Sequence, residues 1–275
     1  MDLRDSMTED NYPPDPGLRK TLRSIESKAV NRASAVVLTS AGTQRMYAAR
    51  YPSLPRERWV HIPNGYDEDS FREAERLPAT RVDERRIHLV HSGLLDPVDR
   101  NPYPFFRALA RLKRDGNVSA ADLRVTLRAT ANEGPYRATL QELGIEDVVE
   151  LAAPLPYVQA LREMLDAHGL LVFQAGNCNH QTPAKLYEYL RAGRPILAIT
   201  DLAGDTAATL LAANCPLEHI AVIDDEQSIY ERLSAFLSVL RQRRAALPDV
   251  ERVQQWSRRG QACALGETLD RVVLQ

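Results

Sequence analysis

Short apolar runs alternate with segments of helical spacing between residues 87 and 223 of the chain. Short apolar runs bounded by turn residues indicate buried strands, whereas apolar residues at three- and four-residue spacing indicate amphipathic helices. The predicted strands span residues 87–92, 123–129, 148–152, 169–175, 195–200 and 219–223. The predicted helices between them span residues 102–114, 135–143, 156–166, 183–192 and 204–213.

This alternation predicts the fold class. Strands that alternate with helices favour right-handed crossovers and a parallel sheet covered by helices on both faces. Six such strands complete a doubly wound α/β domain, in which ligands bind at the carboxyl ends of the strands. Two helical stretches, residues 226–245 and 250–273, follow the sheet and are separated by Pro248.

The chain before residue 75 shows a weaker pattern. Two strands without a covering sheet cannot bury enough apolar surface to fold independently. We therefore expect this part either to complete the edge of the main domain or to be the end of a second domain. In the second case, apolar surface around residues 36–38 is exposed and the protein self-associates. The predicted elements are helix 18–30, strand 33–39, helix 41–49 and strand 59–62, followed by a charged stretch over 73–86.

Composition and charge narrow the class of protein. The 275 residues are 44% hydrophobic and 26% charged, as in an ordinary globular protein, and the net charge of −2 gives no basic field for nucleic acid. Arginines gather between residues 241 and 259, where we interpret them as a solvated helical face, with a membrane-surface or subunit contact as the alternative. Because no apolar run is long enough to span a bilayer and the first residues are too polar for a signal peptide, we expect a cytoplasmic protein with at most peripheral membrane contact.

Cysteine and metal-ligand patterns add no further chemistry. Three widely spaced cysteines support neither a disulfide framework nor a zinc site, so we interpret them as reduced thiols. No cluster of histidines and acids has the spacing of metal ligands. We therefore expect neither a bound metal nor a cofactor.

Residues 180–199 carry the main candidate chemistry, because a loop there leads into a helix that a glycine ends before a buried strand. The helix opens at Thr182, Pro183 and Ala184. Unpaired backbone N–H groups and the positive end of the helix dipole favour a phosphate at such a start. Lys185 in the first turn opposes that dipole unless an anion is bound, so its position favours contact with a diphosphate.

Glu188 is the candidate for binding a ribose. It follows the helix start by about 9 Å along the axis, at 1.5 Å per residue. At that distance its carboxylate can accept both hydroxyls of a ribose whose diphosphate rests on the helix start. The alternative is an exposed residue that pairs with Arg191 at i+3. The first interpretation predicts a nucleoside diphosphate of UDP or GDP type as the ligand.

Three further candidates lie in predicted loops. Gly93 and Arg100 follow the strand 87–92, at the edge where open α/β sheets bind ligands. Arg100 is either a second cation for the diphosphate or a surface arginine. His180 either hydrogen-bonds a sugar or a phosphate or has no role.

Motifs along nearly the whole chain resemble one family. The segment after strand 59–62 is similar to the linker of the two-domain (GT-B type) nucleotide-sugar-dependent glycosyltransferases, the glycosyl transferases group 1 family. Ser92 and Gly93 resemble the first strand and glycine turn of that family's donor domain, and Trp256 resembles an aromatic residue of its closing helix. Glu188 matches the second glutamate of the family's best-known motif, with the glycine-x-proline at 193–195. The linker residues that carry the resemblance are Asn64, Gly65, Tyr66, Asp67 and Phe71.

This resemblance implies an activity and a site. It implies a Rossmann-like donor domain, beside a partial second domain, that transfers a sugar from a nucleoside-diphosphate sugar to an acceptor hydroxyl without a metal. The loop 153–156 stands where the family's nucleobase slot lies. The implied catalytic residues are His180, Arg100 and Lys185. The implied nucleotide-binding residues are Glu188, Gly93, Thr182, Pro183, Ala184 and Pro154.

The chain departs from the family in two respects. His180 stands where the family commonly has its first glutamate, near the donor sugar. Family members run to about 350 to 400 residues, so most of the acceptor domain is missing. We therefore expect residues 1–75 to be a remnant of the acceptor domain plus linker, 76–248 the donor domain, and 249–275 a helix packing back toward the amino-terminal part.

Three functions remain open at this point. The first is a glycosyltransferase donor domain, which we expect to bind its donor but to be inactive alone. The second is a catalytically incomplete nucleotide-sugar-binding subunit, completed by a separate acceptor-domain polypeptide or by a homo-oligomer. The third is a sugar-nucleotide epimerase. The acceptor itself is not predicted.

Overall fold

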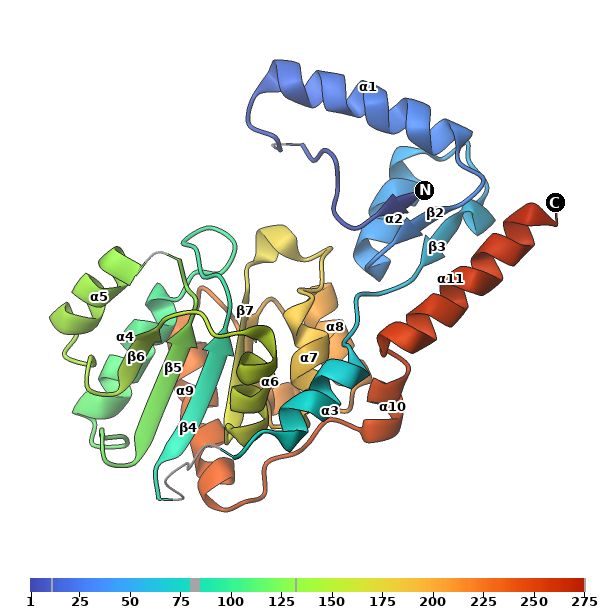
Figure 1. Cartoon of the computed structure of the whole chain (residues 1–275). Helices are drawn as coiled ribbons and strands as arrows, with labels where there is room; N and C mark the ends of the chain where they lie inside the picture. The colour runs from blue at the N-terminus through green and yellow to red at the C-terminus, as the bar shows by residue number, and fades with distance from the viewer. Residues whose placement is uncertain (11, 80–84, 132, 275) are drawn as a thin grey trace.

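A six-stranded parallel sheet forms the larger part of the computed structural model, which describes residues 1–10, 12–79, 85–131 and 133–274 (Figure 1). The strand order is β6-β5-β4-β7-β8-β9, and every pair is parallel. This order confirms the predicted doubly wound α/β class, with the order reversing between β4 and β7. The strands are β4 (Ile87–Ser92), β5 (Leu123–Arg128), β6 (Val149–Ala152), β7 (Gly169–Gln174), β8 (Ile196–Thr200) and β9 (Ile220–Ala221).

Helices cover both faces of this sheet. Alternate strand residues point to opposite faces, so Leu89 and Leu171 pack with α4 and α9 on one side, whereas Val90 and Leu170 pack with α6 and α7 on the other. All four side chains are fully buried. The helices of this part are α4 (Tyr103–Arg114), α5 (Glu133–Glu142), α6 (Tyr157–Asp166), α7 (Lys185–Ala192), α8 (Asp205–Ala212) and α9 (Glu226–Arg241).

A second, three-stranded parallel sheet lies in the amino-terminal part. Its order is β1-β2-β3, with β1 at Asp2–Leu3, β2 at Val36–Leu38 and β3 at Trp59–His61. The sequence did not predict β1, because two residues are too few to show a strand pattern. The helices here are α1 (Pro16–Arg32) and α2 (Ala41–Arg50), and a short 3-10 turn (Arg56–Arg58) precedes β3.

The strand β2 is buried on both faces. Val36 and Leu38 pack with Val30 of α1 and Tyr47 of α2, and β1 pairs alongside. No residue of β2 is more than 7% exposed. The prediction of exposed apolar surface around residues 36–38 is therefore wrong.

A buried carboxylate joins α1 to α2. Glu26 is fully buried and accepts hydrogen bonds from the Tyr47 hydroxyl at 3.0 Å, the Tyr51 hydroxyl at 2.8 Å and the Thr8 hydroxyl at 3.2 Å. Arg50 adds an ion pair at 2.8 Å. Burial and the bond to Glu26 raise the pKa of Tyr51 to about 12, so both tyrosines stay protonated donors to the carboxylate. A buried charge needs such a set of partners.

The linker after β3 leads into a helix that belongs with the larger sheet. In α3 (Glu68–Arg76), Asp67 caps the first turn by accepting from the Ser70 backbone N–H at 3.2 Å. Phe71 and Ala74 are fully buried in the core of the six-stranded sheet. The predicted charged stretch 73–86 therefore begins as part of this helix, and its residues 80–84 lie outside the described residues.

The last helices return to the linker. In α10 (Val250–Gln254) Val253 packs in the core of the larger sheet, and α11 (Arg258–Val273) runs beside the amino-terminal part (Figure 1). A Cβ on Gly65 would lie 2.2 Å from the Trp256 carbonyl oxygen, so only glycine allows the linker to pass this close. Residues 249–275 were predicted to pack back toward the amino-terminal part, and these contacts are made by that segment. The domain boundaries at 75 and 248 remain predictions.

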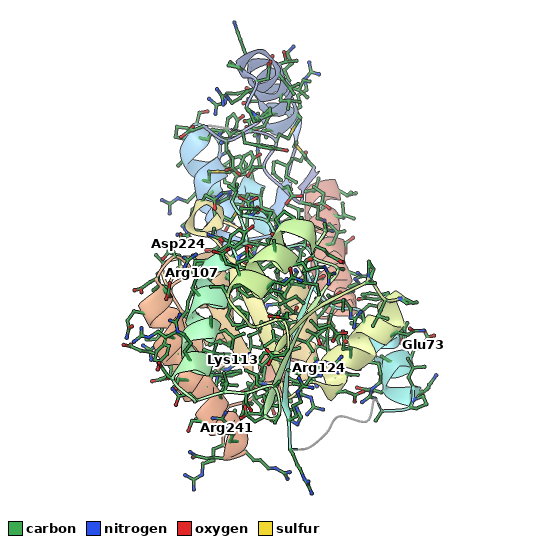
Figure 2. The ribbon with its side chains drawn as sticks, turned by 90° about the vertical axis from the view of Figure 1, so that its left-hand side faces the viewer. Glu73, Arg107, Lys113, Arg124, Asp224 and Arg241 are labelled. Atoms are coloured by element: carbon green, nitrogen blue, oxygen red, sulfur yellow. The ribbon has the colours of Figure 1, made fainter. Side chains whose placement is uncertain are left out.

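Several charged side chains on the surface of the larger part pair with acids within the chain, among them Arg107, Lys113, Arg124 and Arg241 (Figure 2). Arg107 donates to Glu226 at 2.9 Å, and Lys113 pairs with Asp147 at 2.6 Å. Arg241, one of the late arginines, lies 3.6 Å from a carboxylate oxygen on the surface. Each such exposed pair contributes little to stability. In the part of the chain that the structure describes, every helix is too short or too polar to cross a bilayer.

Candidate nucleotide-diphosphate site

The candidate site lies where the strand order of the larger sheet reverses, between β4 and β7. Gly93 directly follows β4, and α7 follows the loop after β7. The Lys185 side chain crosses between them, with its Nζ 3.4 Å from Nε2 of His91. Gly93 has φ +118°, and a Cβ there would lie 2.6 Å from the Lys185 Nζ. Glycine is therefore required at this position both for the backbone conformation and for room.

Lys185 is a largely buried cation that forms no ion pair within the described residues, although the Glu188 carboxylate, one turn along the helix, attracts it from beyond 4.0 Å. Burial of Lys185 and the nearby positive charge of Arg100 lower its pKa to about 8. Burial also holds the pKa of His91 well below its usual value, so this ring is neutral. Nδ1 of His91 lies 2.9 Å from the Leu171 carbonyl oxygen and Nε2 lies 3.1 Å from the Gly93 carbonyl oxygen, so the neutral ring donates to one of these oxygens and adds no charge beside the ammonium. Within the described ranges no carboxylate oxygen lies within 4.0 Å of Lys185, and this is the electrostatic situation of an anion site.

Arg100 approaches the same place from the loop after β4. Its guanidinium lies 3.5 Å from a carboxylate oxygen of Asp96. The backbone N–H of Ala175, just after β7, donates to the Asp99 carbonyl oxygen at 2.8 Å and holds this loop against the sheet edge. The structure thus brings together Gly93, Arg100 and Lys185, as the sequence predicted from their positions at strand ends.

Glu188 lies one turn along α7 from Lys185, on the same face of the helix. Its Oε1 accepts a hydrogen bond from the Tyr157 hydroxyl at 2.7 Å, and burial raises its pKa. Arg191, the alternative partner, donates instead to Glu68 at 2.6 Å. The alternative prediction, a local ion pair between Glu188 and Arg191, is therefore not observed. The Glu188 carboxylate instead lies beside the Tyr157 hydroxyl, on the same helix face as Lys185.

Tyr157 is a site residue that the sequence analysis missed. It opens α6 directly after the loop 153–156, so the loop and Glu188 are joined through its hydroxyl. The sequence feature that could have indicated Tyr157 is its position after the carboxyl end of a predicted strand, where ligand-binding residues gather. Pro154 lies exposed in this loop. The sequence analysis also missed His91, although a histidine inside an otherwise apolar strand is unusual enough to indicate a functional residue.

The start of α7 differs from the prediction. The helix begins at Lys185, two residues later than predicted, with Ala184 as an N-cap that makes no side-chain bond. Thr182 is turned away from this start, because its hydroxyl lies against Thr209 of α8 at 3.4 Å. The Pro183 carbonyl oxygen accepts from the Leu186 N–H at 2.9 Å, so the chain enters the helix through a turn. Thr182 therefore lies before the helix rather than in its first turn, whereas Ala184 lies at the helix start, and nucleotide binding by either residue stays a prediction.

His180 faces the amino-terminal part of the molecule. Its Nε2 lies 2.8 Å from a carboxylate oxygen of Glu9. Its carbonyl oxygen accepts from the Thr43 hydroxyl at 2.8 Å and from the Ser40 hydroxyl. His180 therefore joins the two sheet-bearing parts, and its bonds run to the amino-terminal part rather than to Lys185.

The fold defines the class of protein: the chain is an α/β protein with a doubly wound six-stranded parallel sheet beside a small parallel sheet, and it is similar in fold to solved glycosyltransferase structures. Anabaena HepE in complex with UDP is similar over 98% of this chain and 71% of its own, with 16% identity and a TM-score of 0.69. Sucrose-phosphate synthase from Thermosynechococcus elongatus is similar over 97% and 64%, with 16% identity and a TM-score of 0.67.

A third similar structure is the α,α-trehalose-phosphate synthase (UDP-forming) from Burkholderia xenovorans, in complex with glucose-6-phosphate. It is similar over 92% of this chain and 64% of its own, with 14% identity and a TM-score of 0.66. The chain thus spans less than two thirds of the length of both synthases. At these identities the likeness establishes the fold. Protein-family models and curated proteins give no match to the chain.

Proposed function

We propose that this chain is the donor-binding part of a glycosyltransferase that takes a sugar from a nucleoside-diphosphate sugar of UDP or GDP type. The observation that carries the proposal is Lys185, a largely buried ammonium held at the reversal of strand order, with Arg100 nearby and no ion-pair partner among the described residues. The likeness in fold to glycosyltransferases, one of them in complex with UDP, supports it.

In this proposal, Lys185 and Arg100 bind the diphosphate and stabilise its negative charge as the sugar leaves for an acceptor hydroxyl. Backbone N–H groups at the start of α7 add to this charge stabilisation. Two cations and a helix start suffice for a departing diphosphate, so we propose metal-independent transfer. Among the described residues, no three side chains of histidine, cysteine, aspartate or glutamate gather as a metal site does.

Glu188 binds the ribose in this proposal, with Tyr157 orienting its carboxylate. Replacing Glu188 with alanine is expected to weaken UDP binding by about 1 to 3 kcal/mol, the range for losing a hydrogen bond to a charged group. Isothermal titration calorimetry measures this change. The control is Glu142→Ala, an exposed residue of α5, which should leave the affinity unchanged. Equal affinities for Glu188→Ala and the unmodified protein exclude Glu188 from the site.

The affinity for UDP is expected to depend on pH through Lys185. In the free protein its pKa is about 8. A bound diphosphate raises that pKa, so above pH 8 binding requires uptake of a proton and weakens as the pH rises. With a pKa of about 8 in the free protein and a higher pKa in the complex, the affinity falls roughly tenfold between pH 7 and pH 9. Calorimetry at both pH values should show this loss, and Lys185→Met should lack it. A flat profile in the unmodified protein contradicts a diphosphate at Lys185.

A second candidate is a nucleotide-sugar-binding subunit that needs a separate acceptor-domain polypeptide. The observation that favours it is length, because the chain spans 64% to 71% of the glycosyltransferases that it resembles in fold. Transfer from a labelled UDP-sugar, measured with and without such a polypeptide, distinguishes the two. Transfer by the chain alone identifies a complete enzyme, whereas donor binding without transfer identifies a subunit.

A further inference from the structure

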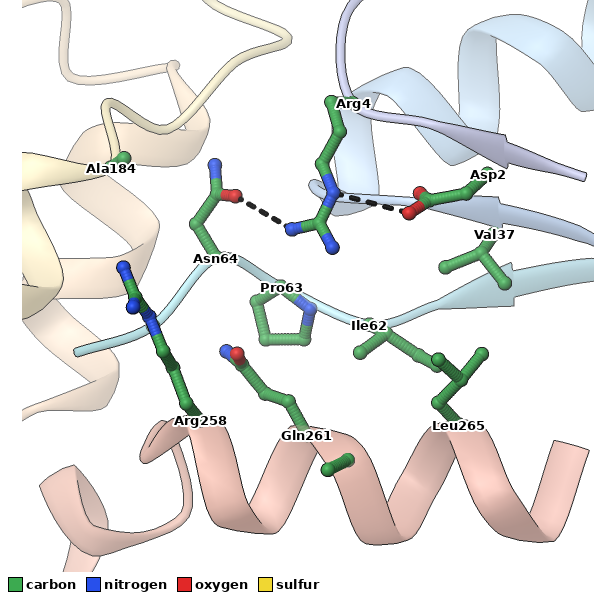
Figure 3. A pocket seen from close by; sticks show the side chains of 12 residues that line it. Asp2, Arg4, Val37, Ile62, Pro63, Asn64, Ala184, Arg258, Gln261 and Leu265 are labelled. Carbon is green, nitrogen blue, oxygen red and sulfur yellow. Dashed lines mark hydrogen bonds and ion pairs between the residues drawn. The ribbon is translucent and has the colours of Figure 1, made fainter. Parts of the chain in front are cut away.

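A second cavity adjoins the candidate donor site on the side of the amino-terminal sheet. It has a volume of about 330 Å³ and lies between β1, the linker, α11 and the start of α7 (Figure 3). Ala184 contributes to its wall and directly precedes Lys185, so the two sites are neighbours. A cavity of this size holds a small molecule such as a single sugar.

Hydrogen-bond donors converge on this cavity from three segments. Arg4 crosses it and donates to Asp2 at 3.2 Å and to the Asn64 amide oxygen at 3.3 Å. Arg258, at the start of α11, points toward Asn64 from the opposite wall (Figure 3). In the described part of the chain Arg258 has no carboxylate within 4.0 Å. The side-chain nitrogen of Gln261 is buried at the wall and has no acceptor there.

The polar groups of the cavity are unbalanced in favour of donors. Among the side chains that line the cavity, Arg4 and Arg258 carry two positive charges against the single negative charge of Asp2, and the carboxylates of Asp67 and Glu188 attract Arg258 from beyond 4.0 Å. The Asn64 amide oxygen is occupied by Arg4, so its amide nitrogen remains as a further donor. A neutral sugar both donates and accepts hydrogen bonds, whereas an oxyanion only accepts them. The donor set therefore matches an oxyanion, which an arginine can bind with two parallel hydrogen bonds.

We propose that this cavity binds the acceptor of the sugar transfer and that this acceptor carries an oxyanion, a phosphate or a carboxylate. Arg258, Arg4 and Asn64 bind the oxyanion, and the apolar side chains of Val37, Ile62 and Leu265 contact the body of the molecule. The proposal rests on the proposed function. Because Ala184 lines the cavity and directly precedes Lys185, an acceptor in the cavity lies beside the residue that binds the diphosphate in this proposal.

Binding of three sugars to the full chain tests this proposal. Calorimetry is performed with glucose 6-phosphate, with glucuronate and with glucose, each in the presence of UDP. At least one charged sugar is expected to bind roughly tenfold or more tightly than glucose, the difference that one ionic hydrogen bond provides. Binding of only the phosphate sugar or only the carboxylate sugar identifies which oxyanion the cavity takes.

Variants locate the binding in the cavity. Arg258→Ala and Arg4→Ala are each expected to weaken binding of the charged sugar roughly tenfold. Arg259 is an exposed neighbour in α11 that faces a different cavity, so Arg259→Ala should leave the affinities for the charged sugar and for UDP unchanged. Equal binding of the three sugars, no binding of any, or binding that both variants leave intact overturns the proposal. UDP titrated alone reports separately on the donor site, so failure of the acceptor cavity is distinguishable from failure of the proposed function.

Discussion

Replacing Lys185 with methionine is expected to lower the affinity for UDP by roughly 10- to 100-fold, because we propose that its ammonium binds the diphosphate. Methionine has a similar length and fits the same channel past Gly93 without a charge. Since Lys185 is a largely buried cation that forms no ion pair within the described residues, its removal should not lower stability. The affinity is measured by calorimetry, and the stability by thermal unfolding.

A matched control separates a local effect from general loss of charge. Lys20 is an exposed lysine of α1, and Lys20→Ala should bind UDP as the unmodified protein does. If Lys185→Met is as stable as the unmodified protein and binds UDP equally well, the diphosphate does not rest on this lysine. The donor site proposed here then has to be abandoned.

Replacing Glu26 with alanine is expected to destabilise the amino-terminal part by about 3 to 5 kcal/mol, the range for removing one partner of a buried ion pair. The Arg50 side chain is only 18% exposed and then keeps no carboxylate partner at this position. Two tyrosine hydroxyls and a threonine hydroxyl lose their acceptor at the same time. Unfolding in urea, followed by circular dichroism, measures the loss.

Two further variants define how this effect arises. Glu26→Gln keeps a hydrogen-bond acceptor without the charge, so it should lose less stability than Glu26→Ala. Lys28→Ala, an exposed substitution two residues away, should change stability by no more than about 0.5 kcal/mol. A Glu26→Ala protein that unfolds at the same urea concentration as Lys28→Ala shows that the buried network is not needed for folding.

The six-stranded sheet could be predicted because its signals are local. Each buried strand is a short apolar run, and each covering helix shows its own apolar spacing, so neither depends on distant residues. The right-handed crossover rule limits the possible topologies of a parallel sheet, but the order β6-β5-β4-β7-β8-β9 itself was decided by the tertiary structure. The strand β1 could not be predicted, because Asp2–Leu3 is a strand only through its pairing with β2.

The candidate site was predicted in part, for the same reason. Gly93, Arg100 and Lys185 follow strand ends or open a helix, and a parallel sheet brings all such positions to one edge. The helix was predicted to begin two residues too early, because the contact of the Thr182 hydroxyl with Thr209 in the next helix leaves no local signal. Arg258 was interpreted as part of a solvated arginine face, and the return of the last helix toward the amino-terminal part was expected only from the family resemblance.

The sequence by itself determined the α/β class, the alternation of strands and helices, and the edge of the sheet where a ligand can bind. Those properties depend on apolar periodicity and on the geometry of parallel strands, which neighbouring residues specify. Only the tertiary structure decided that Lys185 is largely buried with no ion-pair partner among the described residues, that Tyr157 bonds Glu188, and that Arg4 and Arg258 face one cavity. Burial and electrostatics depend on every group packed around a side chain, and most of those groups are distant in the chain.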